Sequence, residues 1–126
     1  MLVRKLAAVS WCVAALAVPQ APAHALVPHV AFSAAVGGSG LYVVSEITIH
    51  QGDTLTLLNL DPQQQHDLVS EDWHNGSRRF ESDAVPVGTP AEVRGVSVLP
   101  PSSYPFLCRL HPEMIGNLHV QPAPVG

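Results

Sequence analysis

Short runs of apolar residues alternate with polar residues along most of this chain, and glycine, proline, asparagine and aspartate separate the runs. No long segment after residue 25 has the period of an amphipathic helix. Because an alternation of period two places one face of a strand inward, the pattern predicts an all-β sandwich or barrel. We expect strands at residues 29–36, 41–50, 54–60, 68–69, 91–99, 104–108 and 117–121.

The segments between these strands have the composition of turns and loops. Gln51-Gly52-Asp53 predicts a turn, residues 61–65 a polar loop that ends at His66, and residues 80–90 an irregular segment. Residues 71–77 predict either a surface loop or a single helical turn. Along the strands, the side chains expected to face inward are Ile47, Ile49, Leu55, Leu57, Leu118 and Val120, and the one expected to face outward is His119.

The first 25 residues have the features of a secretory signal peptide. Arg4 and Lys5 are basic, and the apolar run at residues 6–18 is too short to span a bilayer. Ala23-His24-Ala25 matches the small-x-small cleavage pattern. We therefore expect a signal peptide at 1–25, one domain at 26–126 and a periplasmic or extracellular location. A buried N-terminal helix is the alternative, and whether the signal is cleaved or kept as an anchor stays open.

Loss of this segment changes the charge and size of the chain. About 100 residues remain, which suits one small domain with one core. The formal net charge of the full chain is −4, and four basic and ten acidic residues would leave −6. This charge argues against nucleic acid or an anionic membrane surface as a partner. We expect a monomer with no membrane span in the mature chain.

The two cysteines fall in different parts of the chain. Cys12 lies in the expected signal peptide, so Cys108 would be alone in the mature domain. A lone cysteine cannot form an internal disulfide, and it is either a stray thiol or a ligand. Oxidising compartments damage stray thiols, which favours the ligand.

A Cys-x-x-His-x-x-Met motif near the C-terminus carries three metal-binding side chains at three-residue intervals. It consists of Cys108, His111 and Met114, and His66 supplies a second imidazole upstream. Two histidines, one cysteine and one methionine are the ligands of a blue copper electron-transfer site. A tight loop off a strand can present all three motif residues to one ion, and Pro112 stiffens that loop by fixing φ. The motif predicts one copper ion.

Each candidate ligand has a simpler interpretation. Cys108 could be a small buried apolar residue, Met114 could fill the core, and His66 could be a surface loop histidine. The first of these would make the spacing of the motif a coincidence. His66 is preferred to the other upstream histidines because it follows a strand and a polar loop; those others are His29, His50 and His74.

The longer motif Tyr-x-Phe-x-Cys-x-x-His-x-x-Met-x-Gly-x-Leu-x-Val resembles that of the cupredoxins, the plastocyanin–azurin group, and the short ligand loop is most similar to the amicyanin type. The resemblance covers most of the mature chain, including Asn59-Leu60-Asp61 before the upstream histidine. It implies a Greek-key cupredoxin-like β-sandwich. It also implies that copper is held by the imidazoles of His66 and His111, the thiolate of Cys108 and the axial thioether of Met114.

The family resemblance also implies an electron port. In cupredoxins the solvent-exposed edge of the loop histidine, here His111, serves this purpose inside an apolar patch. Leu110, Pro112 and Ile115 are the candidates for that patch.

Two positions depart from the family pattern. Asp67 stands after the upstream histidine, where asparagine or serine is common and ties the two ligand loops together. Its charge near the copper would favour Cu(II) and lower the potential. The turn before the cysteine strand is Pro100-Pro101-Ser102-Ser103 instead of Pro-Gly.

Several functions are compatible with this ligand set. The leading hypothesis is an exported carrier of single electrons between redox partner proteins, which the sequence does not identify. A copper chaperone, a storage protein or a sensor module would use the same ligands, and a metal-free binding module is a further alternative. We do not expect an enzyme, because Leu107 and Arg109 flank Cys108 where related enzymes carry histidine, and four ligands leave no open position for substrate.

Overall fold

The computed structural model describes residues 25–36 and 39–125, so the expected signal peptide lies outside the described residues except for Ala25. Within the described residues the chain forms ten strands and one short 3-10 helix. The elements are β1 (Pro28–Val36), β2 (Ser39–Tyr42), β3 (Glu46–His50), β4 (Thr54–Asn59), β5 (Val69–Ser70), β6 (Trp73–His74), β7 (Ser77–Arg78), β8 (Pro90–Glu92), the helix η1 (Val96–Val98), β9 (Ser102–Leu107) and β10 (Ile115–Gln121).

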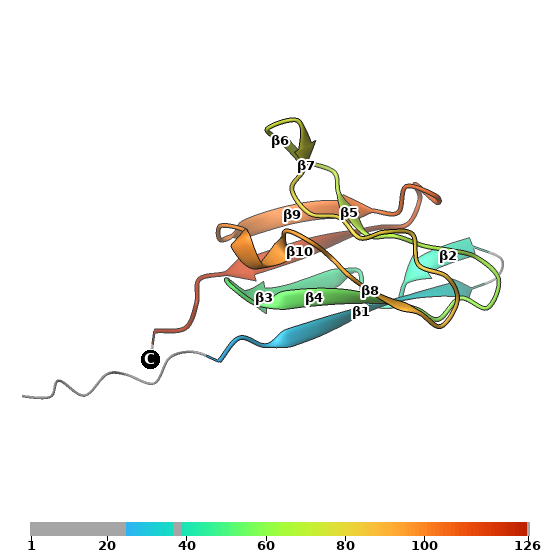
Figure 1. Ribbon diagram of the computed structural model, residues 1–126, viewed down its shortest axis with the longest axis horizontal. Coiled ribbons are helices and arrows are strands. Elements are labelled where there is room, and N and C mark those ends of the chain that lie inside the picture. Colours follow the sequence, from blue (N-terminus) through green and yellow to red (C-terminus); the bar gives the residue numbers. More distant parts are fainter. Residues whose placement is uncertain (1–24, 37–38, 126) are drawn as a thin grey trace, which may run out of the picture.

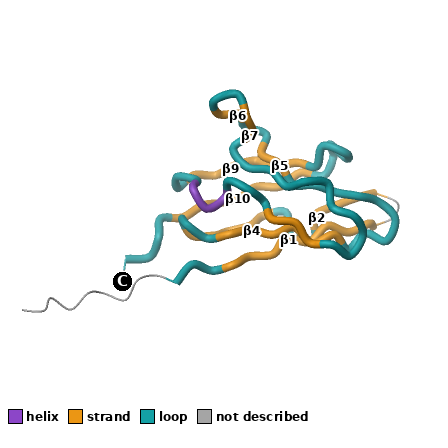
Figure 2. Tube along the Cα trace, in the orientation of Figure 1, coloured by secondary structure: helices purple, strands orange, loops and turns teal. Residues whose placement is uncertain are grey.

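Two four-stranded sheets pack against each other, as Figure 1 shows. One has the strand order β2-β1-β4-β8 and the other β3-β10-β9-β5. β1 pairs in parallel with β4, and β10 with β3, whereas the neighbouring pairs are antiparallel. Figure 2 shows that strands and loops make up almost the whole described chain. The prediction of an all-β sandwich is confirmed.

The core lies between the two sheets and follows the predicted alternation. Leu55 and Leu57 of β4 and Leu118 of β10 are completely buried, and Ile49 of β3 is 1% exposed. Phe106 is also completely buried, and the ring of Tyr42 meets it edge-on with centroids 5.0 Å apart. Burial of an aliphatic side chain such as Leu55 or Ile49 contributes about 1.5–3 kcal/mol to stability. The alternation therefore accounts for much of the packing between the sheets.

Three predicted elements differ from the structure. The strand expected at 41–50 is interrupted at 43–45, because the chain crosses there from the first sheet to the second. The strand expected at 91–99 stops early, since Gly95 adopts a φ of 90° and leads into η1. Residues 71–77 form neither a simple loop nor a helical turn: they belong to the hairpin β6–β7. Asn75 and Gly76, with φ of 52° and 80°, supply its turn.

The buried carboxylate of Asp53 closes the end of the sandwich at the β3–β4 turn. Its oxygens accept the backbone N–H groups of Val27 at 2.9 Å and His50 at 3.0 Å, and Nε2 of His29 lies 2.9 Å away. Burial alone would raise the pKa of Asp53, but these hydrogen bonds outweigh it and lower the pKa to about 2. The side chain therefore ties the start of β1 to the turn in its charged form.

This carboxylate predicts a specific loss of stability in acid. Because the folded-state pKa of Asp53 is below its unfolded value, its contribution is complete above about pH 4 and disappears as the pH falls toward 2. Urea unfolding of the wild type and Asp53→Asn at several pH values measures it. The stability difference between the two proteins should shrink steadily across that window. A difference that does not change with pH would contradict this role.

Candidate metal centre

Cys108 opens a tight loop that both neighbouring strands hold in place. It follows β9 directly, and Leu107 pairs with Ile115, the first residue of β10. The N–H of Cys108 donates to the carbonyl of Met114 at 3.0 Å, and the N–H of Met114 donates to the carbonyl of His111 at 2.8 Å. These hydrogen bonds bring the three motif residues to one end of the sandwich.

A buried asparagine shapes the loop that leads to His66. The side-chain amide of Asn59 donates to the carbonyls of Gln64 at 2.7 Å and Val85 at 2.8 Å. The N–H of Val85 in turn donates to the carbonyl of His66 at 2.7 Å. As a result the imidazole of His66 is completely buried and faces the loop that carries Cys108.

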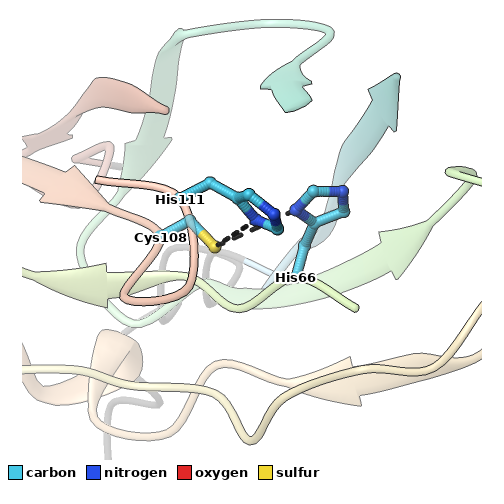
Figure 3. A group of neighbouring side chains, drawn as sticks. All are labelled: His66, Cys108 and His111. Atoms are coloured by element: carbon cyan, nitrogen blue, oxygen red, sulfur yellow. Dashed lines mark hydrogen bonds between the residues drawn. The ribbon is translucent and has the colours of Figure 1, made fainter. Parts of the chain in front are cut away.

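The two imidazoles and the thiol converge on one point. Nδ1 of His66 lies 3.9 Å from Sγ of Cys108, and Nδ1 of His111 lies 3.8 Å from the same sulfur. Possible ligand atoms of the three residues lie within 4.8 Å of one another, and Figure 3 shows both rings beside the sulfur. Among the described residues, these two histidines and the cysteine therefore form a cluster close enough to bind one metal ion.

Met114 is buried beside this group, and a glycine makes room for it. A Cβ atom on Gly40 would lie 2.6 Å from Sδ of Met114 and 2.6 Å from Cε1 of His66. The thioether and the imidazole therefore both contact the same glycine, and any larger residue there would displace one of them. Gly40 has no signal in the sequence, because its importance depends on contacts with residues far away in the chain.

A buried aspartate determines which nitrogen of His66 is free. Oδ2 of Asp61 lies 2.6 Å from Nε2 of His66, and the carboxylate is 1% exposed. Hydrogen bonds from the N–H of Gln63 and then from His66 lower the pKa of Asp61, so the group is charged. The carboxylate therefore holds the imidazole proton on Nε2, which leaves the lone pair of Nδ1 directed toward the sulfur.

Solved copper proteins share this arrangement of sheets. A proline variant of amicyanin in the oxidised state aligns with a TM-score of 0.56 and 16% identity, over 71% of this chain and 80% of that protein. A purple cupredoxin from Nitrosopumilus maritimus aligns with a TM-score of 0.55 and 26% identity, over 72% of this chain and 99% of that protein. The chain has the cupredoxin fold.

One further solved structure matches this chain over only a small part of its own length. A Cu-containing nitrite reductase from Thermus scotoductus SA-01 aligns with a TM-score of 0.56 and 22% identity, over 75% of this chain but only 22% of the reductase. No protein-family model and no curated protein matches the sequence. The cupredoxin likeness is therefore visible in the fold and in the ligand motif.

The side chains at this end of the cupredoxin fold fit one copper ion. Two imidazole nitrogens and a cysteine sulfur converge there, and a thioether is packed beside them. Soft sulfur suits Cu(I) and imidazole nitrogen suits Cu(II), so the combination serves both oxidation states. Burial raises the pKa of the Cys108 thiol, and nearby backbone N–H groups of Asp67, His111 and Leu110 partly offset this effect.

The charge that sequence analysis placed beside the copper is paired in the structure. Asp67 is 2% exposed, and its carboxylate accepts the backbone N–H of Arg109 at 2.8 Å and Nε of Arg109 at 2.7 Å. The expectation that Asp67 lowers the copper potential therefore does not include the positive charge of Arg109 beside it. In the sequence, Arg109 stands out only as a residue that flanks Cys108.

The loop from Cys108 to Met114 contains the partly exposed residue of the candidate site. His111 is partly exposed, whereas His66 and Cys108 are completely buried. Leu110 is 51% exposed and Pro112 is exposed, so apolar side chains flank His111 on both sides along the chain. Ile115 is also exposed, as expected.

Replacing Asp61 should weaken copper binding without unfolding the domain. In Asp61→Asn the imidazole of His66 loses its charged partner, and losses of this kind typically cost 10- to 100-fold in metal affinity. Competition titration against a chromophoric copper chelator measures the change. Asp53→Asn is a matched control, because Asp53 is also a buried carboxylate beside a histidine but precedes β4, whereas Asp61 follows it.

The control should retain wild-type copper affinity. Equal weakening in both variants would show that general loss of stability, and not the contact with His66, causes the effect. Unchanged affinity in Asp61→Asn would remove Asp61 from the site.

Proposed function

We propose that this protein is an exported, mononuclear type 1 copper protein that carries single electrons between redox partners. The observation that supports it best is the convergence of Nδ1 of His66, Sγ of Cys108 and Nδ1 of His111 at one buried point. In this proposal these three residues bind the copper ion and Met114 is the weaker fourth ligand.

The hydrogen bonds that position the proposed ligands favour electron transfer. Bound copper supplies the one-electron chemistry, and the chain has only to hold the ligands in nearly the same positions in both oxidation states. The pairing of Leu107 with Ile115 anchors the residue before Cys108. The hydrogen bond from Cys108 to Met114 closes the loop, and Asp61 orients His66. Ligands positioned before the metal arrives need little rearrangement, which favours fast transfer.

His111 is the proposed route for the electron. Its Nδ1 lies 3.8 Å from the buried sulfur, the residue is partly exposed, and its chain neighbours Leu110 and Pro112 are exposed. A partner that covers these apolar side chains would approach the ligand set through a single imidazole.

An enzyme is less well supported than a carrier. Leu107 and Arg109 flank Cys108, so no imidazole extends from the cysteine to a second metal. Surface cavities of about 340 and 430 Å³ in the described part of the chain are lined by residues other than the four proposed ligands. Neither of these two cavities therefore places a substrate on the proposed ligands.

Location and partners follow from the sequence. The signal peptide expected at 1–25 supports a periplasmic or extracellular location, and the mature protein is proposed to be a monomer. Within the described residues, no helix is long and apolar enough to cross a membrane. The formal net charge, −6 without the signal, suits redox partners with a basic docking surface.

Copper titration of the mature domain tests the proposal. One equivalent of Cu(II) should produce an intense visible thiolate-to-copper band and narrow copper hyperfine splitting in the EPR spectrum, because Cys108 supplies the sulfur. Cys108→Ala should lose both signals. A pale complex that the mutation does not change would contradict the proposal.

Reversible voltammetry and electron self-exchange then separate a carrier from a chaperone, storage protein or sensor. A carrier should show a reversible one-electron wave and fast self-exchange. Irreversible reduction with release of copper would favour storage or delivery.

A further inference from the structure

An ion pair joins the two loops that carry the proposed ligands. Asp67 follows His66 and Arg109 follows Cys108, and the two partners are 42 positions apart in the sequence. Both carboxylate oxygens are used, because one accepts the backbone N–H of Arg109 and the other accepts its Nε. The side chain of Asp67 thus fixes the position of the loop immediately after the cysteine.

The backbone at Asp67 is also fixed, and it faces the sulfur. The buried hydroxyl of Tyr42 donates to the carbonyl of Asp67 at 2.6 Å. The N–H of Asp67 points to Sγ of Cys108 at 3.5 Å. Because hydrogen bonding around the cysteine sulfur tunes the potential of such copper sites, a shift of Asp67 would change the environment of the metal.

The guanidinium of Arg109 has further partners that hold it over the carboxylate. Nη2 donates to the carbonyl of Ser82 at 3.3 Å, and Nη1 lies 3.6 Å from the carboxylate of Glu81. The Arg109 side chain is 43% exposed, whereas that of Asp67 is 2% exposed. The negative charge is therefore buried near the proposed copper ligands, and the arginine covers it from the solvent side.

We propose that Arg109 is a positioning residue that offsets the charge of Asp67, so that the pair links the ligand loops without lowering the copper potential. This inference rests on the proposed function. An aspartate without the arginine would stabilise Cu(II) over Cu(I), and an arginine without the aspartate would do the reverse. Where cupredoxins commonly connect the two loops through a neutral asparagine or serine, this chain connects them through two opposite charges.

A double-mutant cycle on the copper-loaded domain tests this assignment. Reduction potentials are measured by voltammetry for the wild type, Asp67→Asn, Arg109→Gln and the double variant. Arg109→Gln should raise the ratio of Cu(II) to Cu(I) affinity about tenfold, which lowers the potential by about 59 mV. Asp67→Asn should raise the potential by less, because Glu81 still faces the guanidinium. The double variant should return close to the wild-type value.

Two further variants separate charge from geometry and from general effects. Arg109→Lys keeps the positive charge but loses the planar fork, so its potential should stay close to that of the wild type. Arg94→Gln removes an exposed arginine whose Nη2 lies 3.1 Å from Asp83, and it should not change the potential. If Arg109→Gln fails to fold, the proposal is tested by the other two variants. It then requires a raised potential in Asp67→Asn and a potential close to that of the wild type in Arg109→Lys.

The possible results are distinct. Equal potentials in all variants of a protein with an intense visible band would overturn the role of Arg109 and leave the proposed function intact. A shift in Arg109→Lys as large as that in Arg109→Gln would also overturn it, because charge would then not be the cause. A wild type without the visible band would contradict the proposed function, and this inference with it.

Discussion

The pairing of β9 with β10 is the constraint on which the site depends. It closes the segment from Cys108 to Met114 into a tight loop, and the hydrogen bond between the backbones of these two residues seals that loop. A thiol, an imidazole and a thioether are then held at one end of the sandwich by the strand pairing and by the hydrogen bonds within the loop. The opposite loop has only to deliver His66, which the buried amide of Asn59 and the backbone of Val85 accomplish.

Two buried carboxylates lie beside the proposed ligands, and they have different roles. Asp61 contacts the far nitrogen of His66 and so determines which nitrogen is free to bind metal. Asp67 has no such contact: it pairs with Arg109 and connects the two ligand loops. The role of each aspartate therefore depends on its hydrogen-bond partner, and not on how far along the sequence it lies from His66.

The sequence predicted the parts of the structure that depend on local pattern. Alternation placed Ile49 and Leu118 in the core, and the C-terminal motif predicted Cys108 and His111 as ligands, which lie close together in the structure. Local pattern could not locate the break at 43–45, because this break depends on where the chain changes sheets. The stop after β8 and the hairpin β6–β7 depended on glycine and asparagine residues in the left-handed region.

The supporting residues of the site were harder to predict for a related reason. Gly40 matters only because His66 and Met114 pack against it. Asp61 has a signal in the sequence, since it ends the Asn59-Leu60-Asp61 segment before the histidine, but nothing in that segment shows that the carboxylate turns back toward the imidazole. Such contacts become visible only when the strands are assembled.

X-ray absorption at the copper edge, in both oxidation states, is the most direct test of the central claim. If His66, Cys108 and His111 converge on one ion in a rigid frame, the copper will have one sulfur and two nitrogen neighbours at short distance in both states. Reduction should change these distances only slightly. A first shell without sulfur, or one that rebuilds when Cu(II) becomes Cu(I), would contradict this account.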